Sequence, residues 1–294
     1  SSTRVSDSIE SMVEKRTKDT YAPAAGKRLI YFIDDFNMPE KEVFGAQPPL
    51  EILRQWMQYG FWYDLKKQTP KHINDTQLVA AMGHPGGGRT QTSARTLHCF
   101  HVLNLTFPAE AQIRQIFGSI VSAHLATFDE DVKLAGEPMV AATYEIYLRM
   151  CSDLLPTPDK PHYTFNLRDI SRVIQGVLQS QRDFYDSRDA IVRLWVHETW
   201  RVLGDRLTND GDRKTFASFI ETSLSSVFGT SFRALFPDET VHPFGDFTRG
   251  ELSEGTSPPY EELSDATALK RHVEGCLEEY NDEPGTSPMD RACF

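Results

Sequence analysis

The stretch Arg28–Asp35, RLIYFIDD, decides the fold class, because it joins a short apolar run to two consecutive carboxylates. Its apolar, β-branched and aromatic composition is typical of a strand that is buried on both faces, as in a parallel sheet. Ligands of α/β folds bind at the carboxyl ends of such strands. The stretch therefore predicts a buried strand that places Asp34 and Asp35 at the mouth of a sheet.

The sequence downstream supports an α/β sheet. The runs QLVAAM (77–82) and FHVLNLTF (100–107) indicate two further buried strands, and FWYDLKK (61–67) with KHIND (71–75) is compatible with a small hairpin. A helix that ends at Gly60 is expected from four apolar residues at helical spacing, Leu50, Leu53, Trp56 and Met57. Strands separated by helices and loops in this way favour an α/β fold.

The pattern becomes helical after Pro108. Several segments between 109 and 229 have helical spacing and none has a strand pattern, which predicts an all-helical second domain. From 230 the chain is richer in Pro, Gly and acidic residues, with one more helix expected at 265–280. The sequence thus predicts an α/β subdomain at 1–108, a helical subdomain at 109–229 and a connector at 230–294.

Composition narrows the classes of partner. The 294 residues carry a formal net charge of −11, so we expect neither nucleic acid nor an anionic membrane as a partner. No apolar run approaches the roughly 20 residues needed to cross a bilayer. His98 and His101 flank a cysteine but lack further ligands nearby, which favours a structural role over a zinc site. Free thiols in a reducing compartment, the cytosol, are expected for the four widely spaced cysteines, Cys99, Cys151, Cys276 and Cys293.

The glycine-rich stretch MGHPGGGRT (82–90) fits the phosphate-loop pattern G-x-x-x-x-G-K-[ST] with Arg89 in place of Lys. A phosphate loop opens directly into a helix, whereas the residues that follow here are poor helix formers. A guanidinium is also not equivalent to the compact lysine ammonium. Moreover, the Asp34–Asp35 strand lies upstream of the stretch, although in P-loop ATPases the acidic strand follows the loop. These differences favour a turn.

The Asp pair is the stronger chemical signal, because apolar residues followed by Asp34 and Asp35 match the Walker B pattern. In that pattern Asp34 would hold Mg²⁺, usually through water, and Asp35 would orient or deprotonate the attacking water. An Asp-Asp turn that caps a strand fits the two residues equally well. A serine-hydrolase triad has no support, since no G-x-S-x-G occurs.

FIDDFNMP (32–39) extends the Asp pair into a rare string and resembles the dynein heavy chain, most closely the third AAA+ module of an axonemal heavy chain. The resemblance runs from about Val13 to the C-terminus. It implies a partial AAA+ P-loop-type parallel sheet followed by an all-α lid, and at 230–294 a connector and the start of the next AAA+ module. Four further motifs carry it: VFGAQPPLEILRQWMQYGFWYD (43–64), AMGHPGGGR (81–89), LPTPDKPHYTFNLRDISRVIQG (155–176) and LWVHETWRVLGDRL (194–207).

The resemblance also implies site residues. QLVAAM matches the sensor I strand, whose usual Asn is replaced by Gly83, so the glycine-rich stretch is the turn that follows. Arg95 matches an arginine finger that reaches the neighbouring module, while His98 stands where a second Arg is expected. Arg168 matches the phosphate-contacting Arg of sensor II. Asp34 is expected on Mg²⁺ and Asp35 on the attacking water.

Three departures from the family pattern bear on activity. Asp35 stands where active AAA+ sites have Glu, and a displacement of about 1 Å can cost roughly a hundredfold in rate. Gly83 supplies no side chain to the phosphate. The Walker A loop is absent from the sequence and is expected upstream, since both ends of the chain look cut. We therefore expect negligible ATP affinity for this chain alone, and an exposed sheet edge.

The expected function is that of an AAA+ ATPase module contributing to ATP-dependent microtubule-based movement in cilia and flagella. Mg²⁺ with ATP or ADP would occupy a regulatory or slow site in the complete module. The implied partners are neighbouring AAA+ modules, dynein intermediate and light chains, and microtubules, and the implied location is the cytoplasm and the ciliary axoneme. The alternative is a structural ring element that transmits conformational change without hydrolysis.

Overall fold

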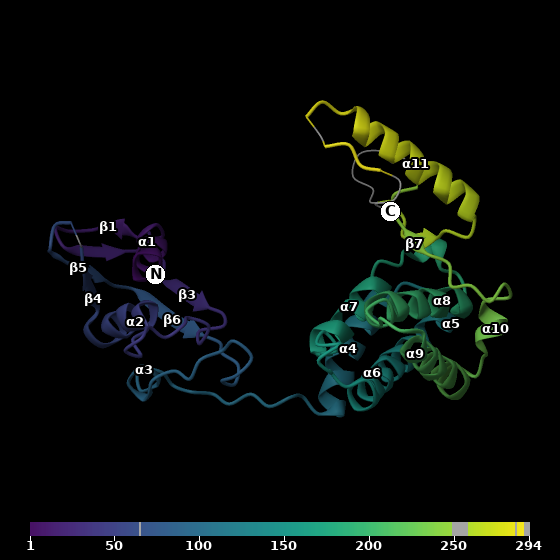
Figure 1. Cartoon of the computed structure of the whole chain (residues 1–294), viewed down its shortest axis with the longest axis horizontal. Helices are drawn as coiled ribbons and strands as arrows, with labels where there is room; N and C mark the ends of the chain where they lie inside the picture. Colours follow the sequence, from purple (N-terminus) through teal and green to yellow (C-terminus); the bar gives the residue numbers. More distant parts are fainter. Residues whose placement is uncertain (65, 249–257, 286, 291–294) are drawn as a thin grey trace. The chain divides into compact units, whose positions relative to one another are not determined.

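The computed structural model describes residues 1–64, 66–248, 258–285 and 287–290. The chain divides into two compact units, Ser1–Thr106 and Phe107–Phe294, and each unit has its own hydrophobic core (Figure 1). No helix among the described residues is long and apolar enough to span a bilayer. The expected division into 1–108, 109–229 and 230–294 stays a prediction, and residues 249–257, 286 and 291–294 of its last part lie outside the described residues.

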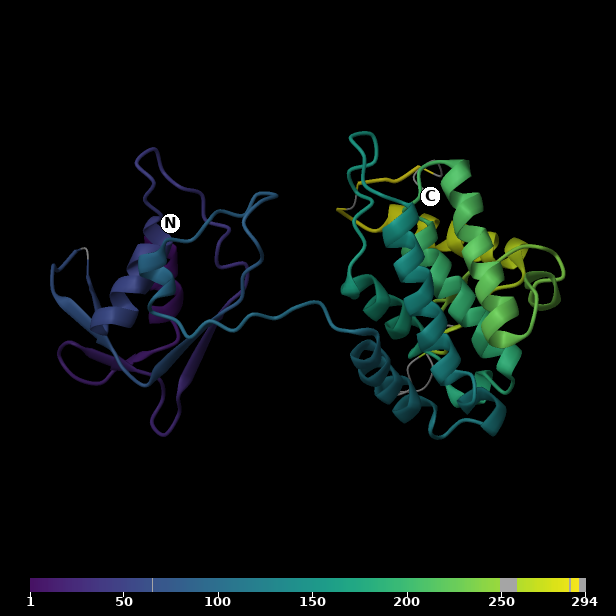
Figure 2. The same cartoon turned by 90° about the horizontal axis from the view of Figure 1, so that it is seen from below.

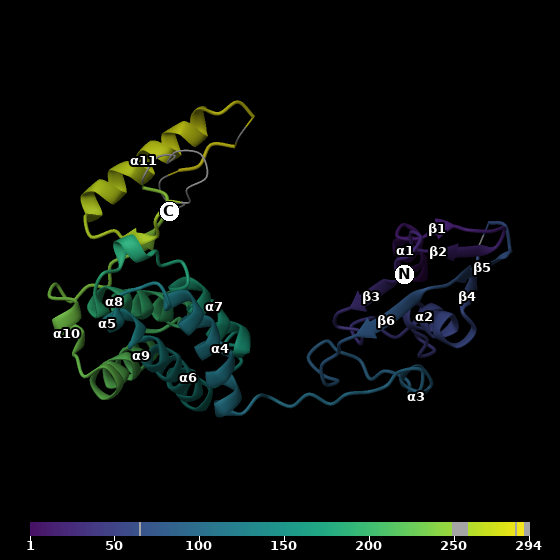
Figure 3. The same cartoon turned by 180° about the vertical axis from the view of Figure 1, so that it is seen from behind.

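The first unit combines short helices with two small sheets (Figure 3). One sheet has the order β1-β2-β5-β4 and is mixed, because β2 pairs with β5 in parallel and the other pairs are antiparallel. The other sheet is the parallel pair β3 and β6. In chain order the elements are α1 (Ser2–Glu10), β1 (Glu14–Lys15), β2 (Thr20–Ala22), β3 (Leu29–Ile33), α2 (Pro48–Tyr59), β4 (Phe61–Tyr63), β5 (Pro70–Ile73), β6 (Thr76–Ala80) and α3 (Ala94–Leu97).

The helix and hairpin expected between β3 and β6 are confirmed. Helix α2 begins with two prolines and ends at Gly60, whose φ of 77° is the left-handed conformation that glycine adopts at helix ends. Strands β4 and β5 then pair antiparallel. The apolar face of α2 packs into the core of the unit with Trp62. The Trp56 and Trp62 rings meet edge to face, with their centroids 5.7 Å apart.

The prediction that the β3 strand is buried on both faces is wrong. Tyr31 and Ile33 pack against the core on one face, but Ile30 and Phe32 on the other are 64% and 60% exposed. Phe32 lies opposite Val79 of β6, which is also exposed. The second face is bare because no element of the described part of this unit covers it.

The predicted third strand at 100–107 is also wrong. The segment has no strand structure, and Val102, Leu103 and Leu105 are 65%, 85% and 90% exposed. An extended segment becomes a strand only when a neighbouring strand satisfies its backbone groups. Within the described residues, β3 and β6 pair only with each other, so segment 100–107 has no strand beside it.

The second unit is a helical bundle, as the sequence predicts (Figure 2). Residues 109–229 contain no strand, and the unit then adds a two-residue antiparallel pair and a final helix. Helix α8 continues into a π-helical turn at Trp200–Gly204, and α9 into another at Leu224–Phe228. The elements are α4 (Glu110–Leu125), α5 (Glu130–Lys133), α6 (Gly136–Asp153), α7 (Leu167–Val177), α8 (Arg188–Thr199), α9 (Asp210–Ser223), α10 (Phe232–Leu235), β7 (Phe244–Gly245), β8 (Glu261–Glu262) and α11 (Ala266–Asp282).

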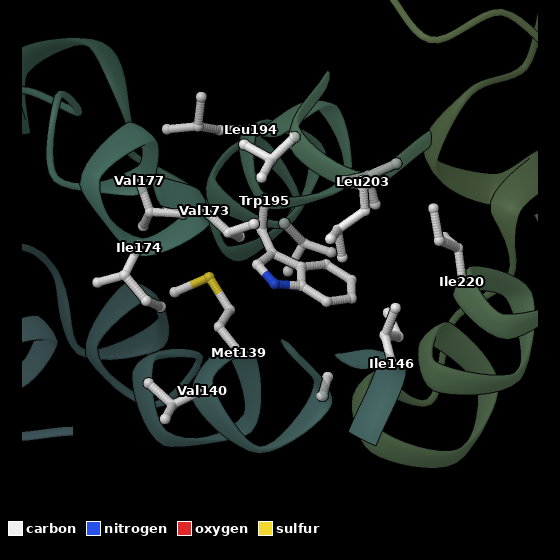
Figure 4. Packing of buried hydrophobic residues seen from close by; sticks show 14 of the residues in the cluster. Met139, Val140, Ile146, Val173, Ile174, Val177, Leu194, Trp195, Leu203 and Ile220 are labelled. Carbon is white, nitrogen blue, oxygen red and sulfur yellow. The ribbon is translucent and has the colours of Figure 1, made fainter. Parts of the chain in front are cut away.

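Trp195 of α8 lies at the centre of the bundle core (Figure 4). Its side chain is fully buried, and its indole N–H donates to Thr143 Oγ1 at 2.8 Å. The Thr143 hydroxyl in turn donates to the carbonyl of Met139, one turn earlier in α6. The core therefore contains a polar chain whose donors are satisfied, which is a requirement for burying polar groups without a large loss of stability.

A buried carboxylate connects three parts of the second unit. Glu198 of α8 is 0% exposed, and its side chain lies against Gly176 of α7. It accepts hydrogen bonds from the Tyr260 hydroxyl at 2.7 Å and from Arg201 Nε at 3.0 Å. Burial raises the pKa of Tyr260, so the hydroxyl keeps the proton that it donates. This network fastens the segment before β8 to helices α7 and α8.

Candidate functional site

The two aspartates lie at the carboxyl end of β3, as predicted. The Asp35 amide donates to Asp34 Oδ1 at 2.9 Å, and Asp35 has a φ of 47°, a conformation that is uncommon for residues other than glycine. The Phe36 amide then donates to the Ala81 carbonyl at 2.9 Å. This bond holds the end of β3 against the end of β6, so that side chains from both strand ends share one edge of the sheet.

Asn37 brings Gly83 into this edge. The Asn37 side chain is almost fully buried, and its Nδ2 donates to the Gly83 carbonyl at 2.8 Å. Its Oδ1 has no hydrogen-bond partner in the described part of the chain. Residues Asp34, Asp35 and Gly83, which the resemblance assigns to one nucleotide site, are therefore adjacent, whereas Asn37 was missed as a positioning residue.

The glycine-rich stretch forms a tight turn and leads into residues without regular secondary structure before α3. Gly86 and Arg89 exchange two backbone hydrogen bonds, of 2.8 and 3.1 Å, across the turn. Gly86, Gly87 and Gly88 have φ values of 126°, 58° and 86°, which side chains other than hydrogen rarely allow. The prediction that this stretch is a turn and not a phosphate loop is therefore confirmed, because no helix begins at this stretch to receive a phosphate.

Thr90 fixes the far side of the turn. Its amide donates to the Asn37 carbonyl at 2.8 Å, and its hydroxyl lies 3.2 Å from the Pro39 carbonyl. Gln47 Nε2 donates to the same hydroxyl at 2.8 Å. The turn is thus tied to the segment that follows the Asp pair.

The anchored turn presents Arg89 to Asp35. Nε and Nη2 of Arg89 lie 3.1 and 3.0 Å from Asp35 Oδ1. The two side chains are 38% and 46% exposed, so the ion pair is accessible to water. A Cβ added to Gly83 would lie 3.1 Å from Cδ and Nε of Arg89, so the absence of a side chain at 83 leaves room for the guanidinium arm.

The site has the ligand chemistry for Mg²⁺, but the described part of the chain forms no phosphate cradle there. A cavity of about 440 Å³ beside the Asp pair is lined by Asp34, Asp35, Phe36, Leu50 and Leu53, among others. Carboxylate oxygens suit Mg²⁺, which proteins bind through one or two carboxylates together with water and substrate phosphates. No three His, Cys, Asp or Glu side chains in the described ranges gather into a metal site. Asp34 therefore fits a site that the nucleotide helps to complete.

Arg95 lies on the short helix α3, and its side chain is 70% exposed. Its Nη2 is 3.9 Å from Glu51 Oε2 of α2, a loose contact that leaves the guanidinium accessible. Its role toward a neighbouring module stays a prediction.

Arg168 lies in the second unit, near the start of α7. It is exposed, and its amide donates to the Asn166 side chain that caps the helix. Asp169 completes the cap, since its side chain accepts from the Asn166 amide at 2.9 Å, and it forms an ion pair with Arg206 at 3.1 Å. The start of α7 is therefore fixed by hydrogen bonds and an ion pair. The role of Arg168 as a phosphate contact stays a prediction.

Comparisons with known proteins give the family. Residues 1–108 match the model of the P-loop containing dynein motor region, and residues 139–231 match that of the AAA+ lid domain. The chain is 46% identical to dynein axonemal heavy chain 2 of Mus musculus over 293 residues, and 46% identical to the dynein-1-beta heavy chain, flagellar inner arm I1 complex, of Chlamydomonas reinhardtii over 296 residues. Each alignment covers 100% of this chain and 6% of the relative.

A 40% identity to dynein axonemal heavy chain 12 of Mus musculus extends over 96% of the chain and 10% of that relative. The chain thus spans a small part of the length of each of these relatives. Its α/β unit and its helical bundle correspond to the two matched domain models. The chain therefore belongs to the axonemal dynein heavy chains and contains a P-loop-type AAA+ region followed by an AAA+ lid.

Proposed function

We propose that this region forms the Walker B, sensor I and lid part of a regulatory or slow Mg·ATP site, in the third AAA+ module of a dynein motor ring. The observation that carries the proposal is the shared edge of β3 and β6, where Asp34, Asp35 and Gly83 lie together. The side-chain amide of Asn37 joins the two strand ends there. The Walker A loop would come from sequence preceding residue 1.

The carboxylates have distinct roles in the proposed site. Asp34 is exposed at the strand end and would hold Mg²⁺, which when bound supplies charge stabilisation to the phosphates. Asp35 would orient the attacking water, but its carboxylate already pairs with Arg89. Together with the shorter reach of Asp compared with Glu, this pairing supports slow hydrolysis.

The lid and the arginines connect the site to its neighbours. Arg168 would contact phosphate from the lid, and Arg95 would reach the nucleotide of the adjacent module. The nucleotide state would then be transmitted by closure of lid and interface, in a motor that acts on microtubules in the axoneme with its intermediate and light chains. The alternative, a ring element that transmits strain without hydrolysis, is favoured by Asp35 and by the missing side chain at Gly83.

Substitution of the two aspartates tests the proposal in the heavy-chain motor region that carries this segment. Asp34→Asn is expected to weaken Mg·ATP binding at this module by about 10- to 100-fold, because a charge-assisted contact of roughly 1.5–3 kcal/mol is lost. Asp35→Glu is expected to leave binding unchanged and to increase hydrolysis. Binding is measured with a fluorescent ATP analogue, and hydrolysis by single-turnover cleavage.

Asp75→Asn is the matched control, because Asp75 is an exposed carboxylate directly before β6, at the opposite end of the strand pair. Binding unaffected by Asp34→Asn would contradict the proposal. Tight binding with no cleavage in either the unsubstituted protein or Asp35→Glu would favour the structural ring element instead.

A further inference from the structure

We propose that Arg89 inhibits hydrolysis at this site, a role called here a brake, because it holds the Asp35 carboxylate and keeps it from positioning water. The glycine-rich turn presents Arg89 to Asp35. The proposal rests on the proposed nucleotide site. It assigns a regulatory role to a stretch that resembles a phosphate loop but lacks its structure.

Three features of the turn direct Arg89 toward Asp35. The three glycines with positive φ let the chain reverse within four residues, and the paired backbone bonds of Gly86 and Arg89 fix that reversal. Thr90 anchors the next residue to the segment after the Asp pair. The base of the Arg89 side chain therefore starts from a fixed point beside the end of β3.

Gly83 provides the space that the arginine arm needs. A Cβ at this position would lie 3.1 Å from Arg89 Cδ and Nε, which is tighter than ordinary van der Waals contact. A side chain at 83 would crowd the arm that reaches Asp35. The missing sensor side chain and the presence of the ion pair are thus two aspects of one arrangement.

The ion pair bears directly on the chemistry. In ATP hydrolysis the water oxygen bonds to the γ-phosphorus, the bond from that phosphorus to the β–γ bridging oxygen breaks, and ADP leaves with inorganic phosphate as the second product. Asp35 would accept a hydrogen bond from the water and receive its proton before that proton reaches phosphate. Arg89 places two N–H donors on Oδ1, so this oxygen is occupied and the orientation of the carboxylate, including Oδ2, is fixed while the pair is formed.

The pair is suited to a brake that can be released. Both side chains are between a third and a half exposed, and ion pairs of this kind contribute little to stability. A bound phosphate group, or the surface of a partner protein, that attracts the Arg89 guanidinium would therefore free the Asp35 carboxylate. Hydrolysis at this site would then depend on what Arg89 contacts.

Single-turnover ATP cleavage by the heavy-chain motor region that carries this segment tests the brake, with hydrolysis at the other modules silenced by substitution. Arg89→Ala is expected to raise the cleavage rate about two- to fivefold, the range that a half-exposed ion pair can account for, with ATP affinity unchanged. Gly83→Ala, which keeps the charge but crowds the arm, is expected to raise the cleavage rate by less than Arg89→Ala does. Arg89→Lys is expected to lie between Arg89→Ala and the unsubstituted protein.

Two controls separate a brake from a structural effect. Adding Asp35→Asn to Arg89→Ala is expected to abolish the gain, because the freed carboxylate is the source of the increase. Arg28→Ala removes the same charge from an exposed arginine just before β3, at the other end of the strand, and is expected to change nothing. An unchanged or lower rate in Arg89→Ala, with ATP still bound, would overturn the brake alone. Failure of every form to bind ATP would overturn the proposed function together with it.

Discussion

Replacement of Trp195 by Ala is expected to lower the free energy of unfolding of the lid by about 3–5 kcal/mol, the range for removing a large aromatic side chain from a packed core. Trp195 is fully buried and contacts residues of several helices, so the bundle cannot close around the space left behind (Figure 4). The loss also removes the donor to Thr143 Oγ1. Amide hydrogen exchange of α6, α7 and α8 in the whole chain measures the change, since it follows the lid separately from the first unit.

Two further variants separate packing from hydrogen bonding at this position. Thr143→Val leaves the indole N–H buried without an acceptor and is expected to cost about 1–3 kcal/mol. Leu148→Ala is the packing control, because Leu148 lies on α6 with Thr143 but is 45% exposed. It is expected to cost much less than Trp195→Ala. A change below about 1 kcal/mol for Trp195→Ala would mean that this residue does not lie in a tightly packed core.

Gly176→Ala is expected to destabilise the lid by about 1–3 kcal/mol, the reverse of the usual gain when Ala replaces Gly within a helix. The added Cβ would lie 1.9 Å from Glu198 Oε2 and 2.1 Å from its Cδ. Glu198 cannot easily move aside, because it is 0% exposed and held by Tyr260 and Arg201. Exchange protection of α7 and α8 reports the loss.

Gly118→Ala is the matched control, because Gly118 lies within α4 of the same unit and a Cβ there meets nothing within 4 Å. It is expected to be neutral or stabilising by up to about 1 kcal/mol. Adding Glu198→Ala to Gly176→Ala should cost less than the sum of the two single changes, since the clash disappears. Strict additivity would show that the two side chains do not compete for the same space.

The local elements of the first unit could be predicted because their signals are local. The apolar runs that become β3 and β6, the spacing of Leu50, Leu53 and Trp56, and Gly60 at the end of α2 all act within a few residues. The exposed face of β3 and the failed strand at 100–107 depend instead on which other elements lie nearby. An apolar run shows that a segment can be buried, but not what covers it.

The same distinction applies to the site. Asp34 and Asp35 follow from the strand that precedes them, and the resemblance placed Gly83 beside them. The pairing of Arg89 with Asp35 depends on backbone angles at three glycines and on a space at Gly83, none of which is visible as a pattern of residue types. Asn37 gave a weak signal, since a polar residue two positions after the Asp pair can bridge neighbouring strand ends.

Calorimetric titration with Mg·ATP tests the central claim most directly, which is that this chain supplies one part of a nucleotide site and requires a Walker A loop to complete it. The chain is compared with the same chain extended upstream through the strand, loop and helix of its heavy chain. We predict binding by the extended form, loss of that binding with Asp34→Asn, and no measurable binding by residues 1–294 alone. Tight binding by residues 1–294 alone would contradict the account, because the glycine-rich turn would then have to hold phosphate itself.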